Sequence, residues 1–417
     1  MITNRNEVEI MAPVGSYESL AAAIQAGANS VYFGVEQLNM RSRSAANFTL
    51  VDLAKIVAKA REHNVKTYLT VNTVLYDQDI ETMHAIMDCA KKEGITAIIA
   101  SDQAAILYAS SIGLEVHIST QLNVSNFETL KFYAQYADVI VLARELTIDK
   151  IKAISEKIKE TNLRGPSGEL VQIEMFAHGA LCMAISGKCY LSLHDNDCSA
   201  NRGACRQICR RSYNVTDSET GEELKIENHY IMSPKDLCTI DFLDKFIDAG
   251  VRVLKIEGRA RSAEYVKRVC ECYNTALEAM AQGTYTQELK YELVEKLKTV
   301  FNRGFWGGYY MGERAGEWCG NYGSTATQRK VYVGKVTNFF GNASVAEVQI
   351  EASPLELGEQ ILFMGETTGV LEMDVEEIRV ALKPVERTVQ GELCSIKTPS
   401  KVRRGDKLYK MVSTTEE

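Results

Sequence analysis

Over the first 260 residues or so, short apolar runs alternate with longer stretches in which apolar and polar residues recur with helical spacing. The runs that predict strands are residues 7–13, 30–35, 66–72, 96–102, 115–120, 137–145, 172–179, 229–233 and 251–258. The intervening stretches SLAAAIQAG, which ends at Gly27, and DLAKIVAKAREHN, which ends at Asn64, place apolar residues near a 3.6-residue period. Alternating strands and helices predict a parallel sheet covered by helices, and about eight units favour a closed (β/α)8 TIM-like barrel.

An open, Rossmann-like sheet is the alternative for such a pattern. That fold ordinarily carries a glycine-rich fingerprint after its first strand. The stretch APVGSYES at this place contains a single glycine, Gly15. The closed barrel is therefore the preferred prediction.

The pattern changes after residue 262, where the predicted barrel domain, residues 1–262, ends. Residues 263–329 contain two helical stretches and a loop rich in glycine and aromatic residues. From residue 330 to residue 417, short strands alternate with Gly, Asn and Pro turns. This last region predicts a small antiparallel β-barrel that acts as an accessory recognition domain.

Composition and charge limit the classes of protein and the cellular compartment that this sequence fits. A formal net charge of −8 argues against a protein that is basic throughout, so any contact with nucleic acid must be local. The first residues lack the apolar core of a signal peptide, and no stretch has the length of a membrane span. We expect a cytoplasmic protein, in which eleven cysteines point to metal binding or catalysis more than to disulfides.

Polar side chains gather where the predicted strands end, which is where the active site of a parallel barrel lies. The period of two places Glu174 and His178 on one face of their strand, and Lys255 and Glu257 on one face of theirs. These four are the candidate catalytic residues. The candidate substrate-binding residues are Arg43, Asn72, Gln121, Arg144, Glu145 and Arg259.

Further observations extend this prediction and set an alternative beside it. Arg41, Arg43, Arg144 and Arg259 suggest a small anionic substrate, because a guanidinium fork pairs with both oxygens of a carboxylate. Polar residues at a strand end can also simply face solvent, and a lone histidine such as His178 is more often structural than catalytic. The HExxH pattern of zinc peptidases is absent.

Six cysteines fall within the segment 182–238. They are Cys182, Cys189, Cys198, Cys205, Cys209 and Cys238. Of these six, only Cys205 and Cys209 are separated by the short spacing that is typical of a zinc knuckle. Wide spacing better suits an iron–sulfur cluster, whose thiolate ligands can come from separate loops, although some of these thiols can be ordinary buried side chains.

The segment from Glu174 to Ser192, EMFAHGALCMAISGKCYLS, resembles the signature of the collagenase-like peptidase family U32. NRGACRQICR, MSPKDL, LKIEGR and the opening APVGSYESLAAAIQAGANSVYFG resemble the same family, so the similarity extends over nearly the whole chain. The resemblance implies a 4Fe-4S cluster near the mouth of a barrel. Its implied ligands are Cys182, Cys189, Cys205 and Cys238, with Cys209 or Cys198 as alternatives for one position.

Several family members that this chain resembles hydroxylate RNA. The resemblance implies prephenate-dependent 5-hydroxylation of wobble uridine in tRNA, with ribosomal cytidine as an alternative target. Peptide hydrolysis is the rival activity, and a cluster-bearing scaffold that binds a partner through its C-terminal domain is a third hypothesis. The implied partners are the tRNA anticodon loop and a small dicarboxylate, with a partner subunit or a second copy of the chain also compatible.

Overall fold

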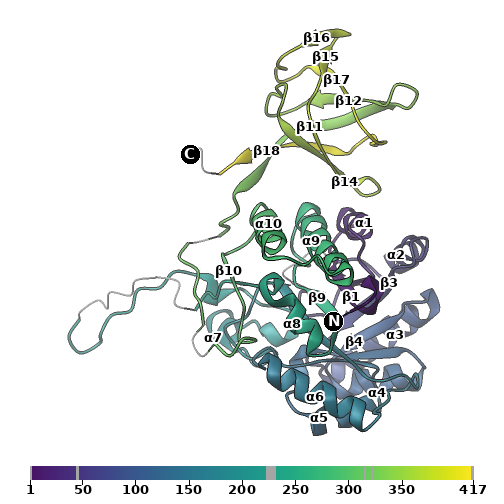
Figure 1. Cartoon of the computed structure of the whole chain (residues 1–417), viewed down its shortest axis with the longest axis vertical. Helices are drawn as coiled ribbons and strands as arrows, with labels where there is room; N and C mark the ends of the chain where they lie inside the picture. Colours follow the sequence, from purple (N-terminus) through teal and green to yellow (C-terminus); the bar gives the residue numbers. More distant parts are fainter. Residues whose placement is uncertain (1, 44–46, 222–231, 314–315, 322, 415–417) are drawn as a thin grey trace.

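The structure, a computed structural model, describes residues 2–43, 47–221, 232–313, 316–321 and 323–414. Eight parallel strands close into a barrel (Figure 1), because the last of them pairs with both the first and the seventh. These strands are β1 (Glu9–Pro13), β2 (Ser30–Phe33), β3 (Lys66–Val71), β4 (Ala97–Ala100), β5 (Glu115–Ile118), β6 (Val139–Val141), β7 (Gln172–Gly179) and β9 (Val251–Ile256). The predicted TIM-like barrel is confirmed.

Helices cover the outside of the barrel, and their apolar faces complete its core. They are α1 (Tyr17–Gln25), α2 (Asp52–Arg61), α3 (Ile80–Glu93), α4 (Gln103–Ser111), α5 (Phe127–Ala134), α6 (Ile148–Glu160), α8 (Leu243–Asp248), α9 (Ala263–Gln282) and α10 (Gln287–Lys298). The short helix α7 (Leu191–Asn196) lies instead in the connection between β7 and β8. Side-chain caps fix several helix starts, since Ser16 accepts from Ser19 N and Asp102 accepts from Ala104 N. No helix among the described residues is both long and apolar enough to cross a membrane.

The barrel has an addition between its seventh and eighth strands. The short strand β8 (Asp236–Cys238) pairs antiparallel with the end of β7, and β10 (Phe305–Trp306) pairs with β8. Most of the predicted strand 229–233 lies outside the described residues. The long connection between β7 and β8 carries most of the clustered cysteines over the mouth of the barrel.

Helix α9 packs as a part of the barrel, although the predicted domain boundary precedes it. Tyr265, Val269 and Tyr273 of this helix are buried in the same core as the barrel strands. A helix that follows the last strand must cover that strand, because the outer faces of β9 and β1 would otherwise meet water.

The C-terminal region is a separate sheet of eight antiparallel strands with a core of its own. Its strands are β11 (Gln328–Phe340), β12 (Val345–Ile350), β13 (Gln360–Gly365), β14 (Gly369–Asp374), β15 (Ile378–Val380), β16 (Lys383–Val385), β17 (Leu393–Lys397) and β18 (Lys407–Ser413). The long strand β11 is bulged twice and pairs with both β12 and β18. At Gly334, beside one bulge, a Cβ atom would lie 1.9 Å from the backbone oxygen of Gln349, so glycine is required there.

This accessory sheet sits over α1 and α9, at the side of the barrel (Figure 1). Leu362 and Val370 pack against Ala22 of α1, and Gln25 donates to Thr368 O at 2.7 Å. The contact leaves the carboxyl ends of the barrel strands uncovered by the sheet.

Candidate functional site

A cavity that is open at its mouth lies at the carboxyl ends of the barrel strands. Loops after several strands supply its wall, since parallel strands end at the same rim of a barrel. Its polar and aromatic lining includes Tyr32, Arg41, Thr70, Asn72, Ser119, Thr120, Gln121, Arg144, Phe176, Ser186, Lys255, Glu257 and Arg259. Asn72, Gln121, Arg144, Lys255, Glu257 and Arg259 of the sequence-based prediction thus share one cavity.

The charges in this cavity are mainly positive. Glu257 forms an ion pair of 2.9 Å with Arg41, from Nη2 to Oε1. Burial opposes ionisation of Glu257, but the charges of Arg41 and Arg259 outweigh burial and hold the pKa of this carboxyl below its usual value. Arg259 is itself buried and donates to Asn39 and to Thr70.

Arg144 differs from the other cations of the cavity. It donates to Ser186 Oγ at 2.7 Å, and its guanidinium lies 5.4 Å from the ring of Phe176. Among the described side chains it forms no ion pair with a carboxylate. Arg144 is thus the guanidinium best placed to receive an anionic ligand.

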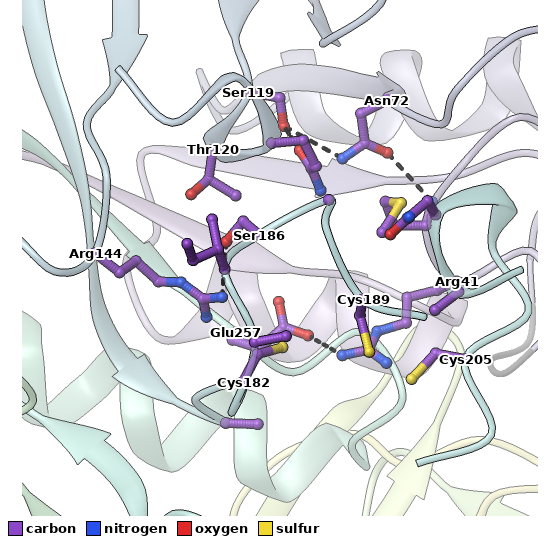
Figure 2. Close-up of a pocket in the computed structure, with 18 of the residues that line it drawn as sticks. Arg41, Asn72, Ser119, Thr120, Arg144, Cys182, Ser186, Cys189, Cys205 and Glu257 are labelled. Atoms are coloured by element: carbon purple, nitrogen blue, oxygen red, sulfur yellow. Dashed lines mark hydrogen bonds and ion pairs between the residues drawn. The ribbon is translucent and has the colours of Figure 1, made fainter. Parts of the chain in front are cut away.

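Four cysteines, Cys182, Cys189, Cys205 and Cys209, line the same cavity. Figure 2 shows Cys182, Cys189 and Cys205 on the side of the cavity that holds Arg41 and Glu257. Cys182 is exposed at the cavity wall; removal of water by the surrounding protein raises its pKa, but the nearby charges of Arg144 and Arg41 lower it by more, so its pKa lies below that of an ordinary thiol. Burial raises the pKa of Cys209 to about 11. Cys182 is therefore more readily ionised than Cys209.

Cys238, predicted as a ligand, does not line the cavity. It lies on β8 in the apolar core of the barrel, and burial raises its pKa to about 12. Cys198 is also absent from the wall of the cavity. The strand β8 turns the Cys238 side chain into the core, and the alternative Cys209 stands with the other three thiols instead.

The thiols surround a space and do not converge on a point. Within the part of the chain that the structure describes, no three His, Cys, Asp or Glu side chains are close enough to hold a single metal ion. A four-iron cluster is larger than one ion, so its four thiolates stand at the corners of a wider space. The four cavity cysteines fit such a cluster by their number, their chemistry and their place around one cavity.

Glu174 lies one layer below the cavity, where it is fully buried. Its Oε1 atom pairs with Lys255 Nζ at 2.7 Å, and its Oε2 atom lies 3.7 Å from His117 Nδ1. Burial disfavours the charge on Glu174, yet Lys255 and His117 together keep its pKa below the usual value. Of the predicted catalytic residues, Lys255 and Glu257 reach the cavity, and Glu174 supports Lys255 from beneath.

His117 is a residue that the sequence-based prediction missed. It is buried on β5, and its Nε2 atom lies 3.2 Å from Glu115 Oε1. Burial lowers the pKa of His117, but Glu115 and Glu174 raise it by more, to about 9. His117 lies two residues before Ser119, so the alternation of side chains along the strand could have identified it.

The predicted position of His178 on the face of Glu174 is wrong. The pairing of β7 with β9 shifts register between Phe176 and His178, and such a bulge breaks the alternation of side chains. The imidazole packs instead near Tyr265, Tyr273 and Phe305. Burial lowers its pKa to about 3, so His178 is a neutral core residue away from the cavity.

The remaining predicted residues divide between the cavity and its surroundings. Asn72 accepts from Met40 N at 3.2 Å and donates to Ser119 Oγ at 3.4 Å, and Gln121 contacts the same serine (Figure 2). Glu145 is exposed beyond the end of β6, and Arg43 lies outside the cavity. Arg41, two residues earlier, occupies the position in the cavity that was expected for Arg43.

Comparison with known proteins shows which proteins this chain resembles. The sequence model of peptidase family U32 matches residues 15–320. A protein of Porphyromonas gingivalis named collagenase is 60% identical, over 98% of this chain and 98% of its own. The tRNA hydroxylation protein P1 of Bacillus subtilis is 30% identical over 86% of this chain and 83% of its own. The 23S rRNA 5-hydroxycytidine C2501 synthase of Escherichia coli is 35% identical over 68% of this chain and 41% of its own.

Proposed function

The chain belongs to peptidase family U32, and we propose that it is an RNA-modifying enzyme that places a hydroxyl group on C5 of a pyrimidine. The proposed target is wobble uridine of tRNA, prephenate is the co-substrate, and a 4Fe-4S cluster is the cofactor. One observation carries the proposal: four cysteines and several guanidinium groups line a single cavity at the mouth of the barrel.

The cluster would be held by Cys182, Cys189, Cys205 and Cys209. Replacing C–H by C–OH is a two-electron oxidation of the base, so the co-substrate that donates the oxygen would be reduced by the same two electrons, and a bound cluster would supply the one-electron redox chemistry that relays them. Arg41 and Arg144 lower the pKa of Cys182, so this thiol ionises readily, as a cluster ligand must. The same positive charges offset the negative charge of a thiolate-bound centre.

Arg144 would bind a carboxylate of the co-substrate. It donates to a neutral hydroxyl, contacts the Cys182 thiol and forms no ion pair among the described residues, so a carboxylate can take the N–H groups that these two partners leave. Arg41 is already paired with Glu257, and Arg259 is held by Asn39 and Thr70. Arg144 is therefore the first contact expected for an acid that enters the cavity.

The base would enter the cavity from a single-stranded loop, because an aromatic carbon inside a stacked helix is out of reach. Asn72, Ser119 and Gln121 offer amide and hydroxyl groups on one side of the cavity, and these groups suit the Watson–Crick edge of a pyrimidine. Phe176 adds an aromatic surface. The ionised Glu257 carboxylate lies at the rim of the cavity, and Lys255 lies deeper in its wall, where it pairs with Glu174.

Peptide hydrolysis is the second candidate, favoured by the 60% identity to a protein named collagenase. Serine, cysteine and threonine nucleophiles normally need a neighbouring base, most often a histidine. No histidine is among the described residues that line the cavity, and His178 lies in the core. Peptide cleavage by the purified, cluster-free protein, lost on Ser119→Ala or Cys182→Ala, would favour the hydrolase.

Deletion of the gene tests the proposal directly. Nucleoside mass spectrometry of tRNA and rRNA should show loss of 5-hydroxyuridine, or of 5-hydroxycytidine for the alternative target. Complementation with the wild-type gene should restore the nucleoside, and complementation with Cys198→Ser should do so too, because Cys198 is outside the cavity. Unchanged levels of both nucleosides in the deletion strain would reject RNA hydroxylation.

A further inference from the structure

A second concave surface lies beside the cavity, on the other side of Cys205, which lines both. Six arginines line it, and we call this surface the arginine basin. They are Arg43, Arg206, Arg210, Arg211, Arg261 and Arg303. No acidic side chain is among the described residues of its wall.

Several of these guanidinium groups are fixed by their neighbours. Phe301 lies 3.4 Å from the guanidinium of Arg261 and 5.0 Å from that of Arg303, so its ring is a support for both. Arg210 donates to Ser233 Oγ at 3.0 Å and to the backbone oxygens of Pro234 and Leu181. These contacts order the positive charges before any ligand arrives, which reduces the entropy cost of binding.

Most of the charge in the basin is not neutralised. Arg303 pairs with Asp236 and Arg211 with Asp195, at 3.3 and 3.4 Å. The other four arginines form no ion pair among the described residues. Burial and the charge of Arg303 lower the pKa of Arg210 and of Arg261, which shows that these cations are crowded. Such a surface is stabilised by an anion with several negative groups.

We propose that the arginine basin binds the phosphate backbone of the RNA strand whose target base occupies the adjoining cavity. The inference rests on the proposed function. Guanidinium forks match phosphate oxygens, and contacts to consecutive phosphates set the position of a strand without reading its sequence. Since Cys205 belongs to both walls, a strand held in the basin places a neighbouring base at the mouth of the cavity.

The charge of the rest of the chain supports a localised contact. The formal net charge of −8 repels a polyanion over most of the surface, so RNA must approach where positive charge is concentrated. Arg43 and Arg206 are exposed in the basin and are free to reach phosphates on its outer side. An acidic polypeptide is the other polyanion to be distinguished by experiment.

The test compares two double variants of the full-length protein, purified without oxygen. Arg43→Ala with Arg206→Ala removes two charges from the basin, and Lys401→Ala with Arg404→Ala removes two equally exposed charges from the accessory sheet. Binding of a fluorescently labelled tRNA anticodon stem–loop is measured by anisotropy over a range of salt concentrations. For the basin variant we expect Kd to rise roughly tenfold, and the slope of log K against log salt to flatten by about 1.4, from about 0.7 per phosphate contact. The accessory-sheet variant should bind as the wild type does.

Three other outcomes would overturn the inference. Wild-type affinity of the basin variant, in a strain whose gene deletion still removes the hydroxylated nucleoside, would reject the basin and leave the proposed function intact. Equal weakening in both double variants would mean that RNA responds to overall charge alone. If the wild type binds poly-glutamate but not the stem–loop, and deletion changes no nucleoside, the basin serves an acidic polypeptide and the proposed function fails with it.

Discussion

The cavity and the layer of side chains directly beneath it are built by the same strands, but they differ in how their charges are paired. Beneath the cavity, the Glu174 carboxylate lies between Lys255 and His117, and all three side chains are buried. In the cavity, Arg144 donates to a neutral serine and the thiols of four cysteines face open space. The lower layer pairs its charges within itself, although Glu174 Oε2 and His117 Nδ1 approach to 3.7 Å without a hydrogen bond, whereas the upper layer leaves donors for a ligand.

This difference separates supporting residues from those that act on a ligand. A buried ion pair that is complete on both sides fixes geometry, and it is costly to break because the remaining partner keeps an unpaired charge. A buried or half-buried cation without a carboxylate is stabilised when an anion binds. We therefore expect substitutions in the lower layer to change stability first, and substitutions in the cavity to change binding and chemistry first.

The largest expected effect distinguishes the thiols of the cavity from the thiol of the core. Cys182→Ser should abolish iron and sulfide binding and the hydroxylated nucleoside, because serine is a poor ligand for iron in a sulfur site. Cys238→Ser should keep iron at the wild-type level and lose roughly 1–3 kcal/mol of stability, since it buries a hydroxyl in an apolar core. Iron and sulfide analysis of protein purified without oxygen, with urea unfolding, measures both.

Cys209→Ser completes this comparison. If the cluster uses Cys209, its iron content should fall with that of Cys182→Ser. Retention of iron in Cys209→Ser together with loss in Cys238→Ser would return the fourth ligand to Cys238 and would require β8 to move.

The next largest effect concerns the buried ion pair. Glu174→Ala leaves the charges of Lys255 and His117 without their shared partner, and we expect a loss of about 3–5 kcal/mol in the free energy of unfolding. Glu115→Ala, at the exposed end of the same chain of contacts, should cost about 1 kcal/mol or less. Equal losses in urea unfolding would contradict the distinction between a buried and a partly exposed carboxylate.

The fold was largely predictable because its signals are local and repeated. Apolar runs of strand length between amphipathic helices require a parallel sheet, and the eight repeated units allow the sheet to close. Sequence pattern does not reveal that α9, the helix after the predicted boundary at residue 262, shares the barrel core and packs against the first strand. Local periodicity does not predict how distant segments pack against one another.

The site was predictable where alternation along a strand holds. Lys255 and Glu257 reach the cavity together as the period of two requires, and Asn72 and Gln121 lie there as strand-end residues. His178 fails because a bulge shifts the register by one residue, which no local pattern reveals. The fourth thiol could not be chosen either, because spacing along the chain does not state which loops meet in space.

A pH titration examines the lower layer further. The pKa of His117 is raised to about 9 in the folded chain, above about 6.5 for an unfolded histidine. Its stabilising contribution is therefore complete below about pH 6.5 and is lost as the pH rises through about 9, with a size of roughly 1–3 kcal/mol. His117→Gln should lack this loss between pH 6.5 and 9, as urea unfolding at each pH would show. A parallel pH dependence in wild type and variant would assign the raised pKa to another group.

The smallest of these effects is expected in the cavity, at the cation without a carboxylate. Arg144→Lys keeps the positive charge but replaces a planar fork by a point charge, so a bidentate contact to a carboxylate is lost while the electrostatic attraction remains. Calorimetry should show Kd for prephenate rising about tenfold, which corresponds to about 1.4 kcal/mol, with unchanged stability. Arg164→Lys, an exposed arginine before β7, is the matched control and should bind prephenate as the wild type does. If Arg144→Lys also binds normally, the acid is held by Arg41 or Arg259, and the guanidinium of Arg144 serves the thiol of Cys182 instead.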